Sequence, residues 1–286
     1  MKTTLKIVIS IVALLLLVVV VGVLWVANID PNNHKQWLQA QVRDATGYEL
    51  QLNGNLGFEL YPWLTISADD VRLANPPGFG DAPLAEIEHV AFRARLLPLL
   101  GRNVEIDTMT LRGLNANLIT AADGRSNWAT GEASASTADA APASGEMPFN
   151  DLRIGGINIE RVNIIVEDLG TESRLQISDL AFTSDELVYG EPINLNLAFA
   201  VLANSPALDA NVNLNGTVNY DLDNGRYDVA PLRLTTELRG NHLPGGRAEV
   251  NMTTALHFDL DAGRFNTESL RIEAPQTRMD LSLIHI

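Results

Sequence analysis

Side chains able to do acid–base or metal chemistry are scattered along this chain. No two histidines stand at the short spacings typical of metal ligands, and the sequence has no HExxH, GxSxG or Walker motif. The five histidines are His34, His89, His242, His257 and His285. Gly78-Phe79-Gly80 lacks the third glycine and the strand–helix context of a dinucleotide site. We therefore expect no catalytic residues, no metal ion and no cofactor, and we expect that the protein is not an enzyme.

One acidic stretch resembles a calcium-binding loop more closely. It runs from Asp221 to Gly225 with the sequence DLDNG, but it lacks the later oxygen ligands and the terminal glutamate of such loops. Alternating apolar residues flank it on both sides, a pattern typical of two strands joined by a tight turn. We interpret the stretch as a hairpin turn.

Composition excludes several partners. The chain of 286 residues has 35 acidic and 20 basic residues and a net charge of −15. Without a basic cluster it is a poor candidate for binding nucleic acid or anionic headgroups. The absence of cysteine excludes disulfides and thiolate metal sites.

The N-terminal segment decides where the rest of the chain is located. Leu5–Val26 is almost wholly apolar, and a bilayer-spanning helix takes about 20 such residues. A cleaved signal peptide is the alternative, and cleavage near Ala27 would release a soluble secreted protein, which could be an enzyme. The apolar run is longer than a signal core, however, and Trp25 is bulky where a small residue is needed. Lys2 and Lys6 lie at the N-terminal end of this segment with no acid beside them, which predicts a cytoplasmic N-terminus and an exported body.

The chain after this segment predicts one helix and then strands. Asp30-Pro31 is a helix-start signal, Leu38, Val42 and Ala45 follow at helical spacing, and Gly47 ends the run. From Tyr48 the apolar period becomes two. Leu50 and Leu52, a turn at Asn53-Gly54, and then Leu56, Phe58 and Leu60 predict a hairpin.

A pattern of two apolar pairs recurs along the strands, with two residues between the pairs instead of one. A β-bulge would return the second pair to the face of the first and bend the strand. Two short strands joined by a small turn would give the same pattern. The four occurrences are Ala85, Ile87, Val90, Phe92; Val104, Ile106, Met109, Leu111; Leu152, Ile154, Ile157, Ile159; and Leu175, Ile177, Leu180, Phe182.

Longer repeats suggest that similar hairpins are added side by side. Val104–Leu118 matches Leu152–Val166 at an offset of 48 residues, and Tyr220–Tyr227 matches Phe258–Phe265 at an offset of 38. Between the first two, the small polar residues of Ala129–Gly145 indicate a flexible linker or a long surface loop. We predict four parts: cytoplasmic tip and anchor (1–29), helix and β segment (30–128), linker (129–147) and repeating β segment (148–286). The last part ends in an alternating stretch, so we expect a longer natural protein.

The expected fold is mainly β: an N-terminal transmembrane helix, one short amphipathic helix, and a curved antiparallel repeating sheet with one apolar face. A single helix is too little to cover that face. Either two sheets pack as a sandwich, which the pattern alone favours, or the face is an open groove for an apolar ligand.

At this point the sequence resembles the N-terminal region of the AsmA family of bacterial envelope proteins. Tyr48 stands where arginine is usual in that family. The resemblance covers about residues 1–128 and rests on the order of the anchor, the Asp30-Pro31 helix, Thr46–Gly54, Pro62–Leu64, Asp70–Pro76, Leu96–Leu100 and Asp123–Trp128.

The resemblance implies an inner-membrane protein with a periplasmic body that acts in outer-membrane assembly. It also implies kinship with bridge-like lipid-transfer proteins, whose curved sheets carry phospholipid acyl chains, and this favours the groove over the sandwich. Expected partners are membrane lipids, other envelope factors and outer-membrane proteins. The alternative function is a non-enzymatic assembly or scaffolding factor that pairs with strands of outer-membrane proteins. We predict a lipid-binding strip of Ile106, Met109, Leu111, Ile157, Ile159, Val162 and Ile164, whose alternative role is core packing.

Overall fold

The computed structural model describes residues 30–59, 63–95, 98, 103–129, 151–188, 190–205, 207–221, 225–240, 243–260, 263–274, 277–281 and 284–285. The expected anchor at Leu5–Val26 lies outside these residues. Among the described helices, none combines the length and apolar character needed to cross a bilayer.

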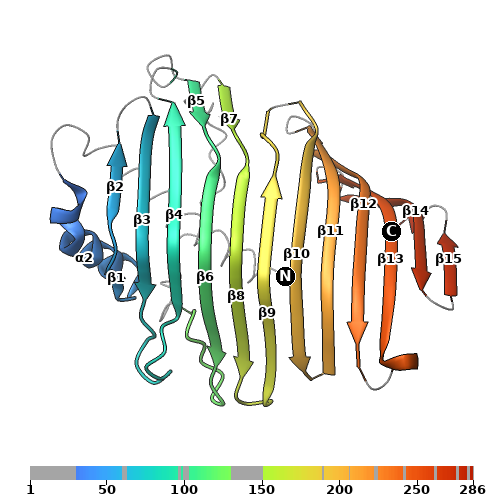
Figure 1. The fold of residues 1–286 in the computed structure, drawn as a ribbon, viewed down its shortest axis with the longest axis horizontal. Coiled ribbons are helices and arrows are strands. Elements are labelled where there is room, and N and C mark those ends of the chain that lie inside the picture. The colour runs from blue at the N-terminus through green and yellow to red at the C-terminus, as the bar shows by residue number, and fades with distance from the viewer. Residues whose placement is uncertain are drawn as a thin grey trace.

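The described strands form one continuous sheet (Figure 1). Its main order is β1-β3-β4-β6-β8-β9-β10-β11-β12-β13-β14-β15, with β2 on β3, β5 between β4 and β7, and β16 on β14. The strands are β1 (Leu50–Leu52), β2 (Leu56–Glu59), β3 (Trp63–Leu73), β4 (Ala85–Arg95), β5 (Asn103–Ile106), β6 (Met109–Thr120), β7 (Asp151–Ile154), β8 (Ile157–Asp168), β9 (Ser173–Ser184), β10 (Ile193–Asn204), β11 (Ala207–Asp221), β12 (Arg226–Arg239), β13 (Arg247–Asp259), β14 (Arg264–Ala274), β15 (Thr277–Leu281) and β16 (Ile284–His285). Short 3-10 turns are η1 (Pro31–His34) and η2 (Pro244–Gly246).

The helix predicted from its end signals is confirmed as the 3-10 turn η1 followed directly by the helix α2 (Lys35–Thr46). The carboxylate of Asp30 accepts a hydrogen bond from the backbone N–H of Asn32 at 3.0 Å, and Pro31 is the first residue of η1. At the other end Gly47 adopts φ +77° and donates its N–H to the carbonyl of Arg43 at 2.8 Å. Within α2, Val42 is the single buried residue.

The hairpin predicted at Asn53-Gly54 is wrong. β1 and β2 do not pair with each other; both pair with β3, end to end. The N–H groups of Asn53 and Gly54 both point to the carbonyl of Asp70, which has φ +44°, so the interruption is a bulge within one line of strand. A Cβ at Gly54 would lie 2.4 Å from the carbonyl oxygen of Asp69, so glycine permits this close approach.

The recurring apolar pattern has two structural origins. In β4 and β9 the strand runs on continuously; in β9, Asp179 has φ +52° and the pairing with β8 shifts register, so the bulge interpretation is confirmed there. The other two occurrences are the alternative case. Asp107-Thr108 separates β5 from β6, and Gly155-Gly156 separates β7 from β8.

The repeat at an offset of 48 residues forms a parallel pair instead of adjacent hairpins. β6 runs parallel to β8, with Met109 opposite Ile157 and Leu118 opposite Val166, and β5 runs parallel to β7. The remaining described pairs are antiparallel, so the expected antiparallel sheet is corrected at this seam. Parallel neighbours require a connection of about a dozen residues or more, which the chain between β6 and β7 provides. The segments before and after this connection therefore share one sheet.

The repeat at an offset of 38 residues forms hairpins, as predicted. Tyr220 pairs with Tyr227 across β11 and β12, and Phe258 pairs with Phe265 across β13 and β14. The stretch that resembled a calcium loop connects the first of these hairpins; Asp221 pairs with Arg226, and residues 222–224 lie outside the described part.

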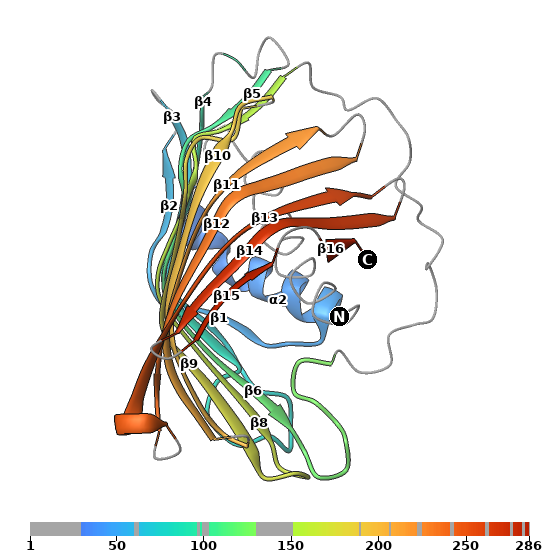
Figure 2. The same cartoon turned by 90° about the vertical axis from the view of Figure 1, so that its right-hand side faces the viewer.

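The sheet is curved along its strands, and α2 lies on its concave side (Figure 2). Irregular residues at one level help to bend it: Gly113 in β6 and Arg161 in β8 both have positive φ, and Asp179 in β9 lies next to them in the pairing. No second sheet covers the first among the described residues, so the sandwich expected from the pattern alone is wrong.

Candidate functional site

The concave face carries unbroken rows of apolar side chains. Following successive cross-strand partners from β2 to β14, one row holds an apolar residue on every strand. All of its members are half-buried except Ala68, which is buried. We call this the central row: Leu56, Ala68, Val90, Leu111, Ile159, Phe182, Leu197, Leu214, Leu234, Met252 and Ile272.

A second apolar row runs beside the central row, from β1 to β13. Its members are Leu50, Leu73, Ala85, Ala116, Ile164, Ile177, Val201, Ala210, Leu238 and Ala248. Partners in register point to the same face of a sheet, so the two rows form one continuous apolar strip perpendicular to the strands.

Helix α2 identifies this strip as the concave lining. The helix lies on the concave side (Figure 2) and contacts β1, where Leu52 is 9% exposed. Leu52 pairs with Val71, and Leu50 of the second row pairs with Leu73. Residues two apart in a strand point to the same face, so Leu52 lies on the same face as the second row. The helix covers only the β1 end of the strip. Few hydrophobic residues in the described part are fully buried, so the strip presents surface rather than a closed core.

The convex face carries paired polar side chains. Arg72 bonds Glu86 at 2.7 Å, and Arg161 bonds Glu88 at 2.5 Å. Asn163 donates to the amide oxygen of Asn115 at 2.9 Å across the parallel seam. These half-exposed pairs suit a face in contact with water, where each contributes little stability.

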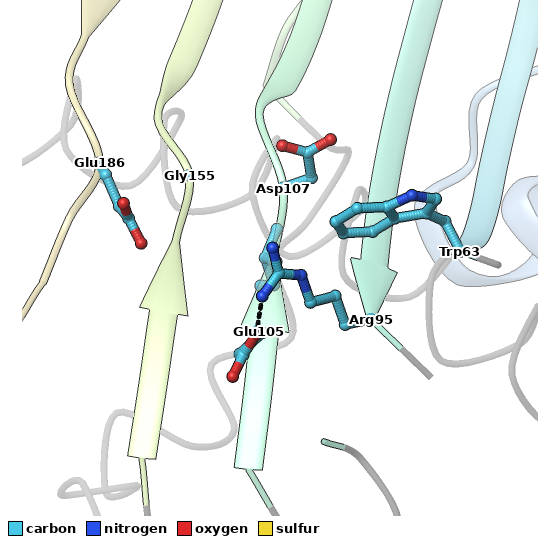
Figure 3. Close-up of a pocket in the computed structure, with 7 residues that line it drawn as sticks. Trp63, Arg95, Glu105, Asp107, Gly155 and Glu186 are labelled. Atoms are coloured by element: carbon cyan, nitrogen blue, oxygen red, sulfur yellow. Dashed lines mark hydrogen bonds and ion pairs between the residues drawn. The ribbon is translucent and has the colours of Figure 1, made fainter. Parts of the chain in front are cut away.

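A pocket of about 230 Å³ lies on the convex face near the ends of β4 and β5 (Figure 3). The Arg95 guanidinium stacks 5.0 Å from the centre of the Trp63 ring and bonds Glu105 at 2.7 Å. Arg93 similarly pairs with Asp107 at 3.1 Å. The residues lining this pocket include no nucleophile–base pair and no apolar wall, so it does not extend the concave strip.

The seven residues predicted for lipid binding are brought together on the concave side. Leu111 and Ile159 belong to the central row, and Ile164 belongs to the second row. Met109 pairs with Ile157 directly beside them. The remaining two, Val162 and Ile106, differ in their surroundings.

Val162 is 3% exposed, and it pairs with Leu180 next to the left-handed Arg161. It therefore packs within the sheet's bend and offers almost no surface. Ile106 pairs with the buried Ala94 and also borders the convex pocket. The prediction stopped at β8, although the apolar strip continues to β14. The missed residues, such as Phe182 and Leu214, carry the same alternation with polar neighbours.

A polar cluster closes the end of β6 beside the strip. Asn127 is fully buried; its Oδ1 accepts from the N–H of Ile119 at 2.8 Å. Its Nδ2 donates to Asn75 Oδ1 at 2.7 Å and to the carbonyl of Asn117 at 2.8 Å. The hydroxyl of Tyr48 donates to the carbonyl of Asn127 at 3.0 Å, and burial raises the pKa of that phenol. Through Asn127, the segment Asp123–Trp128 thus connects the N-terminal part of the sheet to β6 by hydrogen bonds.

Two curated proteins similar to this chain are both AsmA proteins. The chain is 24% identical to AsmA family protein YhjG of Escherichia coli over 237 residues, which is 79% of this chain and 32% of that protein. It is 30% identical to Protein AsmA of E. coli over 101 residues, 35% of this chain and 16% of that protein. The chain therefore spans less than a third of the length of these curated relatives. No solved structure matches it.

The sequence model of the AsmA family matches residues 1–277, which include α2, the parallel seam and the whole apolar strip. By this match, the chain belongs to the AsmA family.

Proposed function

We propose that the concave strip carries the acyl chains of phospholipids. The observation that carries this proposal is the central row, which is apolar on every strand from Leu56 to Ile272 and left uncovered by the described elements. A water-exposed strip of this length is costly for a protein to keep, and exposed apolar patches generally mark binding surfaces.

The curvature suits a chain-like ligand. An acyl chain lying along the row would contact one apolar side chain on each strand, and each buried methylene contributes about 0.8 kcal/mol. The headgroup would stay in water at the open side of the trough. Successive strands offer similar contacts, so a lipid can move along the row by passive sliding with no covalent step. Such a carrier needs no catalytic residues and is not an enzyme.

We place the protein in the bacterial inner membrane, with a single span at Leu5–Val26, a cytoplasmic N-terminus and the sheet in the periplasm. Membership of the AsmA family is consistent with envelope biogenesis or lipid transfer. A role in outer-membrane assembly, together with other envelope factors or outer-membrane proteins, would follow if lipid moves along the strip toward that membrane.

Site-specific photo-crosslinking tests the proposal on the full chain in its membrane. A benzophenone amino acid is placed at Ile159 on the concave face or, as the matched control, at Thr183 on the convex face. Thr183 is next to Phe182, the cross-strand partner of Ile159, so the two probes sit at the same height in the sheet.

We expect phospholipid adducts from the probe at Ile159 and none from the probe at Thr183. Equal adducts from both probes, or none from Ile159, would overturn the proposal. Adducts of Ile159 with protein segments instead of lipid would support the scaffolding alternative.

A further inference from the structure

Two histidine–aspartate pairs lie on the convex face, one near each end of the sheet. His89 Nδ1 lies 2.7 Å from Asp69 Oδ1 across β3 and β4. His257 Nδ1 lies 2.6 Å from Asp228 Oδ1 across β12 and β13. Both histidines are about equally exposed, at 30% and 31% of their side-chain area. In each pair the aspartate bonds Nδ1 and so fixes the orientation of the ring, and Nε2 is the ring nitrogen that can still bind another group.

The surroundings of Nε2 distinguish the two histidines. The Nε2 of His257 is buried and has no hydrogen-bond partner. Glu268 Oε2 lies 3.7 Å from it, on β14. Asn266, the direct cross-strand partner of His257, has a buried Oδ1 that also lacks a partner. Among the described residues, the hydrogen bond with Asp69 is the one polar side-chain contact of His89.

We propose that His257, Glu268 and Asn266 form a binding site for a divalent transition-metal ion such as Zn²⁺. The ligands would be His257 Nε2, a carboxylate oxygen of Glu268 and Asn266 Oδ1, with water completing the coordination. Zinc bonds nitrogen and oxygen at about 2.0–2.2 Å, so two ligands of a tetrahedral ion stand about 3.4 Å apart. The separation of 3.7 Å between His257 Nε2 and Glu268 Oε2 needs only a small adjustment.

Asp228 completes this arrangement as a positioning residue. A metal-binding histidine commonly donates its other N–H to a carboxylate, which fixes the tautomer and the ring orientation. The 2.6 Å contact between Asp228 Oδ1 and His257 Nδ1 has this form. No three His, Cys, Asp or Glu side chains in the described part converge on one point, so the site depends on the amide oxygen of Asn266 as its third ligand.

A metal-free explanation exists for the same two unpaired atoms. If the Asn266 amide were turned over, its Nδ2 would face His257 and could donate a hydrogen bond to Nε2. The side chain of His257 would then be satisfied without an ion. The two explanations differ in whether the protein binds zinc, and the chain supplies its own control in His89.

The test titrates Zn²⁺ into the full-length protein in detergent micelles and measures binding by competition with a fluorescent chelator. We expect one site that is lost in His257→Ala and unchanged in His89→Ala. Glu268→Gln should weaken it at least tenfold, and Asp228→Asn by about 10- to 100-fold. Co²⁺ should give a visible d–d absorption spectrum that His257→Ala abolishes.

Circular dichroism and melting temperature verify that each variant is folded, and Glu268→Gln replaces His257→Ala if the latter is not. Absence of stoichiometric zinc binding by the unsubstituted protein would overturn the proposal in favour of the turned amide. Equal zinc binding by the unsubstituted protein and the folded His257→Ala variant would overturn it too, since the metal would then sit elsewhere. Lipid binding on the opposite face is independent of both outcomes.

Discussion

A single carboxylate on the central row should stop lipid binding without unfolding the sheet. The most informative change is Ile159→Asp, because Ile159 is half-buried and pairs with apolar residues on both sides, Leu111 and Phe182. A charge at this point interrupts the strip between its two halves. The matched control is Thr183→Asp, which adds the same charge to the exposed convex side of β9.

The two costs can be compared from the structure. Half-burial of isoleucine contributes about 1 kcal/mol and its strand preference about 1 kcal/mol, so Ile159→Asp should destabilise the protein by about 2 kcal/mol. Folded domains are stable by about 5–15 kcal/mol, so the sheet should survive. Strands are spaced by about 4.8 Å, which an acyl chain crosses with about four methylenes, and losing their contact costs about 3 kcal/mol. A loss of that size weakens binding about a hundredfold.

Native mass spectrometry of identically purified full-length proteins measures the bound phospholipid, and thermal melting monitored by circular dichroism checks the fold. We expect lipid with the unsubstituted protein and with Thr183→Asp, and very little with Ile159→Asp. Retention of lipid by Ile159→Asp would refute the reasoning, as would equal loss in both variants. Unfolding of Ile159→Asp would show that this residue is part of a packed core instead of a binding strip.

Three further predictions concern the framework around the strip. Asn127→Ala removes three hydrogen bonds from a fully buried side chain and should lower the free energy of unfolding by about 3 kcal/mol in urea denaturation, whereas a loss below about 1 kcal/mol would contradict the role of the cluster. Gly113→Ala places a Cβ 2.3 Å from the Glu88 side chain at φ +67° and should cost about 1–2 kcal/mol in the same assay; an unchanged midpoint would contradict it. Burial raises the pKa of the Tyr48 phenol above that of the unfolded chain, so the folded state holds this proton more tightly. Its contribution to stability is complete below about pH 10 and is lost as pH rises through the folded pKa, so unfolding free energies at about pH 9 and about pH 11 should differ less in Tyr48→Phe than in the unsubstituted protein.

Local signals predicted the local parts of the fold. The start of the helical segment η1–α2 follows from Asp30 and Pro31, and its end follows from Gly47, because capping involves only neighbouring residues. The alternation of apolar and polar residues likewise predicted an apolar face. The central row could have been extended to Leu214 and beyond by the same rule, since partners in register share a face whatever their sequence separation.

Strand pairing could not be predicted in the same way. Asn53-Gly54 has the composition of a hairpin turn, but both flanking strands, β1 and β2, pair with β3 instead of with each other. The glycine lies in a bulge between them. The repeat offset of 48 residues was visible, yet nothing in either copy specifies whether its neighbour runs parallel or antiparallel. The four residues of the proposed metal site come from three strands, so their proximity depends on strand register and not on their spacing in the sequence. They are Asp228, His257, Asn266 and Glu268.

The parallel seam between β6 and β8 has a consequence for how the chain assembles. From β8 to β14 every strand pairs with the next strand in sequence, so this region can form by closing one short loop after another. Joining β6 to β8 instead requires closure of a far longer loop, a step whose entropy must be overcome before its contacts form. Two half-sheets should therefore form early and meet late at this seam. Because the closure entropy grows only slowly with loop length, lengthening the connection should change refolding speed little and final stability by less than about 1 kcal/mol.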